Sequence, residues 1–559
     1  MRTVLLFLPA VLLGLAAGSG LAQTTALHRF DGAAAGDGLG ISVAGAGDVN
    51  QDGWADVIAG AYNADPGGRT DAGQATVFSG KDGSILYRFD GLAAGNWFGW
   101  SVAGAGDVNR DGFPDLVVGA YRADPGGRTA AGQAMVLSGK DGAALYLFDG
   151  PAAGDRLGIA VVGADVNRDG HADLIVGAYS ADPGGRSNAG QATVFSGKDG
   201  SILYRFDGRG AGDELGWSVA AADVDRDGYP DVIVGACSAD PGGRTDAGQV
   251  TVYSGKDGSM LRTFDGLAAG DRFGMAVAAA ADVDRDGHPD VIVGAYRADP
   301  GGRTDAGQAT VFSGKDGRIL HTLDGPVAGD HFGRSVAGAD LDRDGYGDIL
   351  VGGDNASPGN RTGAGQAAAF SGRTGSLLFT CDGVAAGDCL GVSVADAGDV
   401  NRDGALDFVV GADMADPGSR TDAGQATVFS ARGIPTISGT GSPAVGGVLT
   451  LALASPGDAN LPYQVGSSLT AGTIPIDRRL LYLGMDALLV VTVQGQLPTV
   501  FSRYGGFLDA SAKATAAIHT PRAPALVGLR IHSAFVTVKA GAPSNLESIS
   551  NTFFFDVTP

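Results

Sequence analysis

The chain has 559 residues, which is too long for one ordinary hydrophobic core and predicts two domains or a repeat array. Its 95 glycines predict many turns, while 44% apolar and 18% charged residues, without a G-X-Y period, exclude both disorder and collagen. The formal net charge of −23 argues against a nucleic-acid or anionic-membrane partner and is compatible with cation binding.

The first 22 residues have the pattern of a secretory signal peptide. Arg2 precedes the apolar run from Val4 to Ala17, which is followed by small residues ending in Gly20-Leu21-Ala22. The run is short for a membrane span, although an uncleaved anchor is the alternative. No later segment holds 18 consecutive apolar residues. We therefore expect a secreted or cell-surface protein with no membrane span after signal cleavage.

One unit of 58 or 59 residues recurs seven times between residues 37 and 431. Each copy contains four short apolar runs bounded by Gly, Asp and Pro, which predict strands rather than helices. In the second copy these runs are residues 100–103, 115–118, 134–137 and 144–147, the last two joined by a Gly-Lys-Asp-Gly hairpin signal. Four antiparallel strands per repeat describe one blade of a β-propeller. A β-solenoid is the competing repeat fold, but its coils are shorter.

The two ends of the repeat region predict closure of the ring. The seventh copy stops after its third strand, at residues 426–429, and lacks the hairpin and the fourth strand. A matching fourth strand stands at residues 26–30, before the first copy. We therefore expect a seven-bladed propeller over residues 23–432, in which strand 26–30 completes blade 7 and leaves no exposed sheet edge.

An acidic loop lies between the first and second predicted strands of every copy. In the first copy, Asp48 to Asp56, side-chain oxygens occupy positions 1, 3, 5 and 9, and glycine occupies position 6. Asp, Asn and Gly also form ordinary turns, but seven copies with oxygens at all four positions favour a hard cation of calcium size. A backbone carbonyl at position 7 supplies a further ligand, and up to seven calcium ions are expected.

The predicted ligands of the seven loops, with position 7 acting through its backbone, are Asp48, Asn50, Asp52, Trp54 and Asp56; Asp107, Asn109, Asp111, Phe113 and Asp115; Asp165, Asn167, Asp169, His171 and Asp173; Asp223, Asp225, Asp227, Tyr229 and Asp231; Asp282, Asp284, Asp286, His288 and Asp290; Asp340, Asp342, Asp344, Tyr346 and Asp348; and Asp399, Asn401, Asp403, Ala405 and Asp407.

The repeat resembles the FG-GAP repeats of the integrin α-subunit propeller. Three copies carry Phe-Gly before the first strand and four carry Leu-Gly, at Leu39-Gly40, Phe98-Gly99, Leu157-Gly158, Leu215-Gly216, Phe273-Gly274, Phe332-Gly333 and Leu390-Gly391. The calcium-type loop and Val-Gly-Ala follow, with tyrosine in most copies where the family has proline. The resemblance covers about 400 residues and implies a calcium-stabilised seven-bladed propeller used for adhesion or ligand binding.

A second repeated loop carries one arginine per blade on the face opposite the acidic loops. A ring of guanidinium groups could capture an anionic or carbohydrate ligand. The alternative is a local structural role, in which Arg69 pairs with Asp65 or Asp71. The arginines are Arg69, Arg128, Arg186, Arg244, Arg303, Arg361 and Arg420.

Residues 433–559 lose the repeat and most of the charge. Apolar or alternating runs at residues 448–451, 488–493 and 553–557 predict a smaller, β-sandwich-like C-terminal domain. The fold class is therefore all-β throughout.

Three cysteines do not form a disulfide framework. Cys237 occupies a position that is tyrosine in other copies and is expected to be a small buried residue. Cys381 and Cys389 are close enough in sequence to pair in an oxidising compartment.

No catalytic motif is recognisable: the sequence contains no H-E-x-x-H, no G-x-S-x-G and no phosphate loop. We therefore expect a secreted, calcium-binding, non-catalytic adhesion or ligand-binding protein with an extracellular protein or glycan partner. The alternative is an extracellular polysaccharide-active hydrolase or lyase. An asymmetric cluster of His, Tyr and acidic side chains on the arginine-bearing face would favour that alternative.

Overall fold

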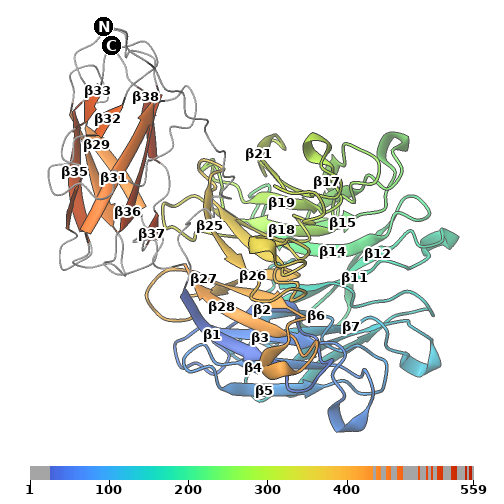
Figure 1. Ribbon diagram of the computed structural model, residues 1–559. Coiled ribbons are helices and arrows are strands. Elements are labelled where there is room, and N and C mark those ends of the chain that lie inside the picture. Colours follow the sequence, from blue (N-terminus) through green and yellow to red (C-terminus); the bar gives the residue numbers. More distant parts are fainter. Residues whose placement is uncertain are drawn as a thin grey trace, which may run out of the picture.

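The computed structural model describes residues 25–431 continuously, together with ten strands between residues 436 and 556. Residues 25–431 form seven four-stranded antiparallel sheets arranged as the blades of a propeller, which confirms the expected fold (Figure 1). The described residues contain short 3-10 turns but no α-helix, and none of their helices is long and apolar enough to cross a membrane. The expected signal peptide, residues 1–22, lies outside the described residues.

Each blade contributes four strands in the same order. The first strands are β2 (Leu39–Gly47), β6 (Ser101–Gly106), β10 (Val161–Ala164), β14 (Leu215–Ala222), β18 (Ala276–Ala280), β22 (Ser335–Ala339) and β26 (Ser393–Gly398). The second strands are β3 (Asp56–Ala61), β7 (Asp115–Ala120), β11 (Asp173–Ala178), β15 (Asp231–Ala236), β19 (Asp290–Ala295), β23 (Asp348–Gly353) and β27 (Asp407–Ala412).

The outer half of each blade follows the same pattern. The third strands are β4 (Gln74–Phe78), β8 (Gln133–Leu137), β12 (Gln191–Phe195), β16 (Gln249–Tyr253), β20 (Gln308–Phe312), β24 (Gln366–Phe370) and β28 (Gln425–Ser430). The fourth strands are β5 (Ile85–Asp90), β9 (Ala144–Asp149), β13 (Ile202–Asp207), β17 (Met260–Asp265), β21 (Ile319–Asp324), β25 (Leu377–Asp382) and, for the seventh blade, β1 (Thr25–Asp31). The 3-10 turns between second and third strands are η1 (Pro66–Gly68), η2 (Pro125–Gly127), η3 (Pro183–Gly185), η4 (Pro241–Gly243), η5 (Pro300–Gly302), η6 (Pro358–Asn360) and η7 (Pro417–Ser419).

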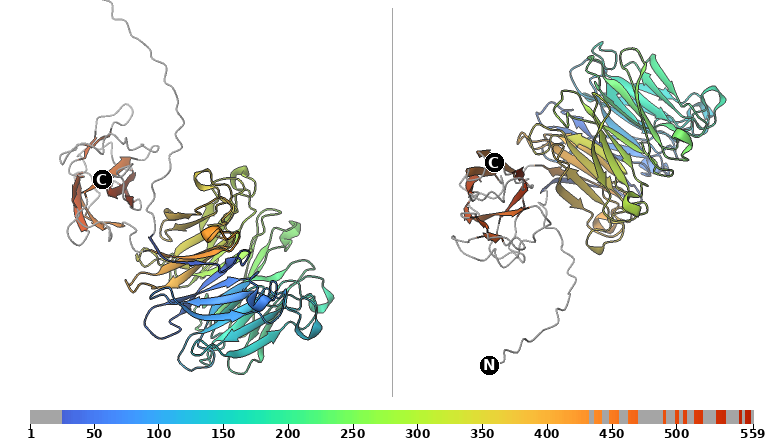
Figure 2. Two further views of the ribbon diagram at one scale, coloured as in Figure 1. Left: turned by 60° about the horizontal axis from the view of Figure 1, so that its bottom comes forward. Right: turned by 90° about the horizontal axis from the view of Figure 1, so that it is seen from above.

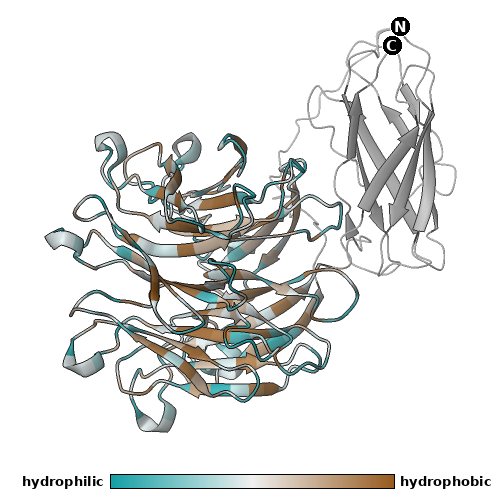
Figure 3. Ribbon diagram, turned by 180° about the vertical axis from the view of Figure 1, so that it is seen from behind, coloured by the Kyte–Doolittle hydropathy of each residue, from teal (hydrophilic) through white to brown (hydrophobic). Residues whose placement is uncertain are grey.

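The hydrophobic core lies between neighbouring blades. All seven second strands are buried at every position, as the apolar sequence of each predicts. One cluster joins Ile58 and Val77 of blade 1 to Val102 and Leu116 of blade 2, and similar clusters follow around the ring. Figure 3 shows hydrophobic colour along the strands and hydrophilic colour on many of the loops. Each blade therefore depends on its neighbours for stability.

The two glycines that define the repeat motif lie where neighbouring blades approach most closely. A Cβ atom on Gly60, in the Ala-Gly-Ala of blade 1, would lie 1.8 Å from the carbonyl oxygen of Gly99 in the Phe-Gly of blade 2. The same contact recurs around the ring and ends with Gly411 against Gly40. Only glycine permits this backbone approach, so both glycines of the motif serve the packing between blades.

The N-terminal strand completes the seventh blade. β1 pairs antiparallel with β28, from Thr25 opposite Ser430 to Asp31 opposite Gln425. Figures 1 and 2 show this blue N-terminal strand beside the orange strands of blade 7. The Phe30 ring stacks on Phe78 of blade 1, with centroids 4.0 Å apart. Chain segments almost 400 residues apart therefore close the ring.

Ten further strands lie in the C-terminal part: β29 (Thr436–Gly441), β30 (Val448–Ala454), β31 (Pro462–Leu469), β32 (Leu489–Val491), β33 (Thr499–Phe501), β34 (Gly505–Phe507), β35 (Lys513–His519), β36 (Arg530–Thr537), β37 (Ser548–Ile549) and β38 (Phe553–Asp556). All of their pairings are antiparallel, as in β29-β30-β35. The segments between them lie outside the described residues, so the sandwich expected over residues 433–559 stays a prediction.

All three cysteines lie in the described part of the chain. Cys237 is 2% exposed and fills a core position, as expected. Cys381 and Cys389 are not joined by a disulfide, so the structure does not contain the suggested pair.

Candidate calcium loops and the opposite face

The acidic loops join the first and second strands of each blade at one end of the propeller. Position 9 of every loop is the first residue of the second strand, and its carboxylate is completely buried in all seven blades. In the fourth loop the Asp231 carboxylate accepts hydrogen bonds from the backbone N–H groups of Val224 (2.9 Å) and Gly255 (3.1 Å). This carboxylate therefore links the loop to the hairpin between the third and fourth strands of the same blade.

Positions 1, 3 and 5 use part of their oxygens to hold the turn. In every loop the carboxylate at position 1 accepts the N–H of the position-6 glycine, at 2.7–3.1 Å. The side chain at position 3 accepts the N–H of position 5, and position 5 accepts the N–H of position 7. The loop backbone thus orients the remaining oxygens towards one another.

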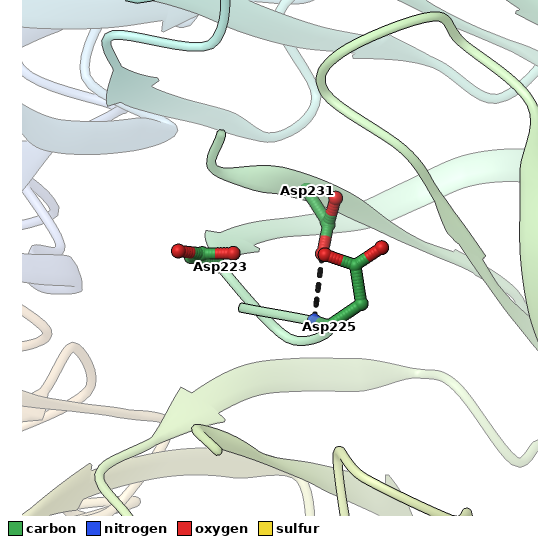
Figure 4. A group of neighbouring side chains, drawn as sticks. All are labelled: Asp223, Asp225 and Asp231. Carbon is green, nitrogen blue, oxygen red and sulfur yellow. Dashed lines mark hydrogen bonds between the residues drawn. The ribbon is translucent and has the colours of Figure 1, made fainter. Parts of the chain in front are cut away.

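Three loops bring three carboxylates within 4.8 Å of one another. They are Asp223, Asp225 and Asp231; Asp282, Asp284 and Asp290; and Asp340, Asp342 and Asp344. Figure 4 shows the first set, in which the carboxylates of Asp225 and Asp231 lie together opposite that of Asp223. The other four loops have asparagine at position 3, so an amide replaces one carboxylate.

The residues fit a hard divalent cation. The Oδ1 atoms of Asp223 and Asp340 are buried without a hydrogen-bond donor, although in five other loops the equivalent atom accepts the N–H of position 5. Burial, together with nearby Asp225, raises the pKa of Asp231 to about 7. A buried carboxylate beside like charges is costly unless a cation neutralises it. Oxygen donors of this kind suit calcium.

Sequence reasoning missed two contacts that surround these loops. Hairpin basic residues lie beside position 5, as in Lys256 Nζ at 3.5 Å from Asp227 Oδ2, on the one face that the antiparallel strand order predicts for both the hairpin and the acidic loop. The position-4 side chain often reaches the next blade: Gln51 donates to the carbonyl of Gly112 at 2.8 Å, and Arg343 to that of Asp403 at 3.0 Å. Position 4 contacts the neighbouring loop only because folding places consecutive blades side by side.

Positions 3 and 9 should respond differently to substitution. Asp231→Ala removes the acceptor of the backbone N–H groups of Asp225 and Gly255 and should lower the free energy of unfolding by about 2–4 kcal/mol with or without calcium. Asp225→Ala removes an exposed carboxylate of the candidate calcium site and should reduce stability chiefly in calcium. Urea unfolding of both variants in calcium and in EDTA measures the difference. Equal losses for Asp225→Ala in the two conditions would contradict its assignment as a ligand.

The seven repeated arginines have local partners on the opposite face. Each donates its Nε–H to a glycine carbonyl at the end of the fourth strand of its blade, at 3.0–3.1 Å. Arg69 also pairs with Asp90 at 3.8 Å, rather than with Asp65 or Asp71 as the sequence suggested. In blade 7, Arg420 contacts Gly32 and Asp31 of the N-terminal segment. These arginines join the end of the fourth strand to the loop between the second and third strands.

A histidine–aspartate group on this opposite face was not anticipated as a site. His331 Nδ1 lies 3.2 Å from Asp354 Oδ1, and Arg334 Nε lies 3.6 Å from Asp354 Oδ2. Tyr296 packs edge-on against His331, with centroids 5.4 Å apart. Burial raises the pKa of nearby Asp413 to about 6, opposed by Arg334. The sequence does distinguish His331, Arg334 and Asp354, because most other copies carry different residue types at the equivalent positions.

Known proteins share the repeat. Seven segments match the FG-GAP repeat model, at residues 39–78, 98–137, 157–195, 215–253, 273–312, 332–370 and 391–429. The chain is 31% identical to integrin alpha-V of Gallus gallus over 219 residues, which is 36% of this chain and 20% of the integrin. It is 32% identical to integrin alpha-5 of Xenopus laevis over 212 residues, which is 35% of this chain and 19% of the integrin.

The chain is also similar to a phospholipase. The chain is 30% identical to phosphatidylinositol-glycan-specific phospholipase D of Rattus norvegicus over 240 residues, which is 36% of this chain and 28% of that protein. The matches thus span about a fifth of the integrins and little more than a quarter of the phospholipase.

Proposed function

Because residues 39–429 belong to the FG-GAP repeat family, we propose that this integrin-like propeller is a secreted or cell-surface protein that binds an extracellular protein or glycan without catalysis. Calcium binding, up to seven ions, is part of the proposal. The observation that carries it is the division of the propeller into two faces. One face is occupied by seven acidic loops and their hairpins, which leaves the opposite face for a ligand.

Calcium would act as a structural ion in this proposal. It would be held by the side chains of positions 1, 3, 5 and 9 together with the carbonyl of position 7, and it would neutralise the carboxylates there. No step of ligand binding passes through the ion. Its contribution is a rigid ring, because neighbouring loops contact each other through position 4.

Capture on glycan and extracellular-protein arrays tests the proposal. The chain from residue 23 onward should bind a defined subset of spots in calcium, and EDTA should weaken that binding by destabilising the ring. The shorter chain from residue 23 to residue 432 separates the propeller from the C-terminal part. Binding that persists in the propeller alone supports the assignment, whereas binding found only with residues 433–559 would move recognition to that part.

A second candidate function is hydrolysis of an extracellular polysaccharide. The group formed by His331, Asp354 and Asp413 favours it, because burial keeps one carboxyl group protonated to higher pH while Arg334 and His331 pair with the other. Release of reducing ends from a polysaccharide panel measures this activity. Activity that disappears in Asp413→Asn would replace the non-catalytic proposal with a hydrolase.

A further inference from the structure

We propose that the mouth of the central cavity, on the face opposite the acidic loops, is a binding site for a neutral carbohydrate. This inference rests on the proposed ligand-binding function and specifies its site and ligand class. The cavity measures about 290 Å³ and is lined by the first strands of all seven blades. Such a volume suits the end of a sugar chain better than a folded protein surface.

The site is built from three equivalent positions in each blade, which we call the rim. The residue before Phe/Leu-Gly is Gly38, Trp97, Arg156, Glu214, Arg272, His331 or Cys389. The residue after it, which lines the cavity, is Ile41, Trp100, Ile159, Trp217, Met275, Arg334 or Val392. The residue after the second strand is Tyr62, Tyr121, Tyr179, Cys237, Tyr296, Asp354 or Asp413.

The residue types of the rim differ between blades, whereas the loops around the rim repeat from blade to blade. The arginine loops keep nearly the same sequence in seven copies, and all seven arginines make the same hydrogen bond. The rim residues instead range from glycine and cysteine to tryptophan, arginine and glutamate. A position that only supports the blade tends to keep residues of similar size and polarity, as the buried Phe or Leu of the repeat motif does. The rim therefore makes this end of an otherwise repeated ring asymmetric, with Cys237, at 2% exposed, as a buried member.

Backbone strain supports a role for these side chains beyond packing. The rim position before Phe/Leu-Gly has positive φ in every blade, 65° at Gly38 and 55–61° at the six other residues. Glycine adopts this conformation freely, whereas other residues pay roughly 1 kcal/mol or more. Six blades nevertheless keep a side chain there. Strain retained in this way is typical of functional positions.

One half of the rim is an aromatic surface. Three of the four tryptophans in the chain are here, and Trp97 and Trp100 stack with centroids 5.5 Å apart. Tyr179 packs against Trp217 at 4.6 Å. The three tryptophans are only partly buried, and Trp100 and Trp217 line the cavity. Partly exposed aromatic rings beside a cavity offer flat apolar surfaces to a ligand.

The rest of the rim carries charges of both signs, some of them in ion pairs. The rim holds three arginines and three carboxylates, so its formal charge is zero apart from His331, although the whole chain carries −23. Arg272 lies 3.9 Å from Glu214, and Arg334 lies 3.6 Å from Asp354. Arg156 lies over the Tyr179 ring at 5.1 Å. The rim positions taken together therefore carry no net charge that would select an ionic partner.

This combination defines the ligand class. A paired guanidinium keeps N–H donors to spare, and a paired carboxylate keeps acceptor sites, so both can bind hydroxyl groups. A sugar presents hydroxyl groups at its edge and apolar C–H groups on its face, which match the polar and aromatic halves of the rim. A basic peptide would need excess carboxylates, and an anionic polymer would need unpaired arginines. A neutral sugar requires neither.

Titration with cellotetraose, xylotetraose, mannotetraose and chitotetraose tests the proposal, read by calorimetry and tryptophan fluorescence in calcium. At least one should bind once per chain. Trp217→Ala should weaken that binding about tenfold or more, because the apolar face of the sugar loses its contact. Trp217→Phe keeps a ring and should retain most of the affinity. Tyr87→Ala is the matched control, because it removes a half-buried aromatic ring from the outer strand β5, away from the rim.

The outcomes separate this inference from the proposed function. Array binding that is unchanged in both Trp217 variants would leave the ligand-binding function standing and overturn the rim as its site. Binding of a penta-arginine peptide or tetragalacturonate, with none of the neutral sugars bound, would overturn the ligand class. A melting temperature for Trp217→Ala equal to that of the unmodified chain excludes unfolding as the cause of lost binding.

Discussion

Removal of calcium is expected to lower the melting temperature of the propeller by about 10 °C or more. An ion that binds only the folded state stabilises it by mass action. A site at ten times its dissociation constant contributes about 1.4 kcal/mol, and seven such sites contribute about 10 kcal/mol. An unfolding entropy of about 2 cal/mol/K per residue over roughly 400 residues converts this free energy to about 12 °C.

The loop geometry gives the physical reason for this dependence. Without a cation, seven completely buried carboxylates at position 9 face other acidic side chains. Burial and the neighbouring Asp342 raise the pKa of Asp348 to about 8, so the ionised form is costly there. A divalent ion would reverse the repulsion within each loop, and the position-4 contacts would extend the benefit to the next blade.

Differential scanning calorimetry in EDTA, in excess calcium and after calcium is restored measures the effect, and elemental analysis counts the ions. Magnesium is the matched control, because its smaller size and strict octahedral geometry suit these loops poorly. Calcium should therefore restore the melting temperature and magnesium should restore much less. An unchanged melting curve in EDTA, with no calcium in the purified protein, would disprove the calcium assignment.

Much of the fold was predictable because the same physical constraints recur seven times. The paired glycines, such as Gly60 and Gly99, appear in every copy since every blade interface needs the same backbone approach. The acidic loops were recognisable from spacing alone, because their oxygens lie within nine consecutive residues. Local requirements of this kind leave a signal in sequence that repetition makes stronger.

The rim was not predictable in the same way. Trp97, Tyr121 and Tyr62 belong to different loops, and only the packing of blade 1 against blade 2 brings them into contact. The residue types at the rim positions vary between copies, so comparison of the repeats finds no shared motif there. The partners of the repeated arginines were also missed, because Asp90 ends the second strand after Arg69 in the chain. Sequence spacing finds contacts within a loop better than contacts across a blade.

Deletion of β1, residues 25–31, is expected to open the ring. The deletion removes a strand whose residues pair along all of β28, and it exposes the apolar partners of Phe30, which is 5% exposed. Loss of one buried phenylalanine costs about 2–3 kcal/mol, and each lost backbone hydrogen bond adds about 1 kcal/mol. The bare edge of β28 then becomes a template for pairing with another chain. The melting temperature should fall by roughly 10 °C, and the protein should self-associate.

A transplanted strand is the matched control for this deletion. In the other six blades a hairpin such as Gly-Lys-Asp-Gly joins the third and fourth strands, so residues 25–32 can be placed after residue 431 through the same linker. The strand would then reach β28 from within its own blade, Arg420 would regain its contacts with Asp31 and Gly32, and stability should return. Calorimetry and sedimentation measure both variants. A deletion variant that stays monomeric with an unchanged melting temperature would show that β1 does not close the propeller.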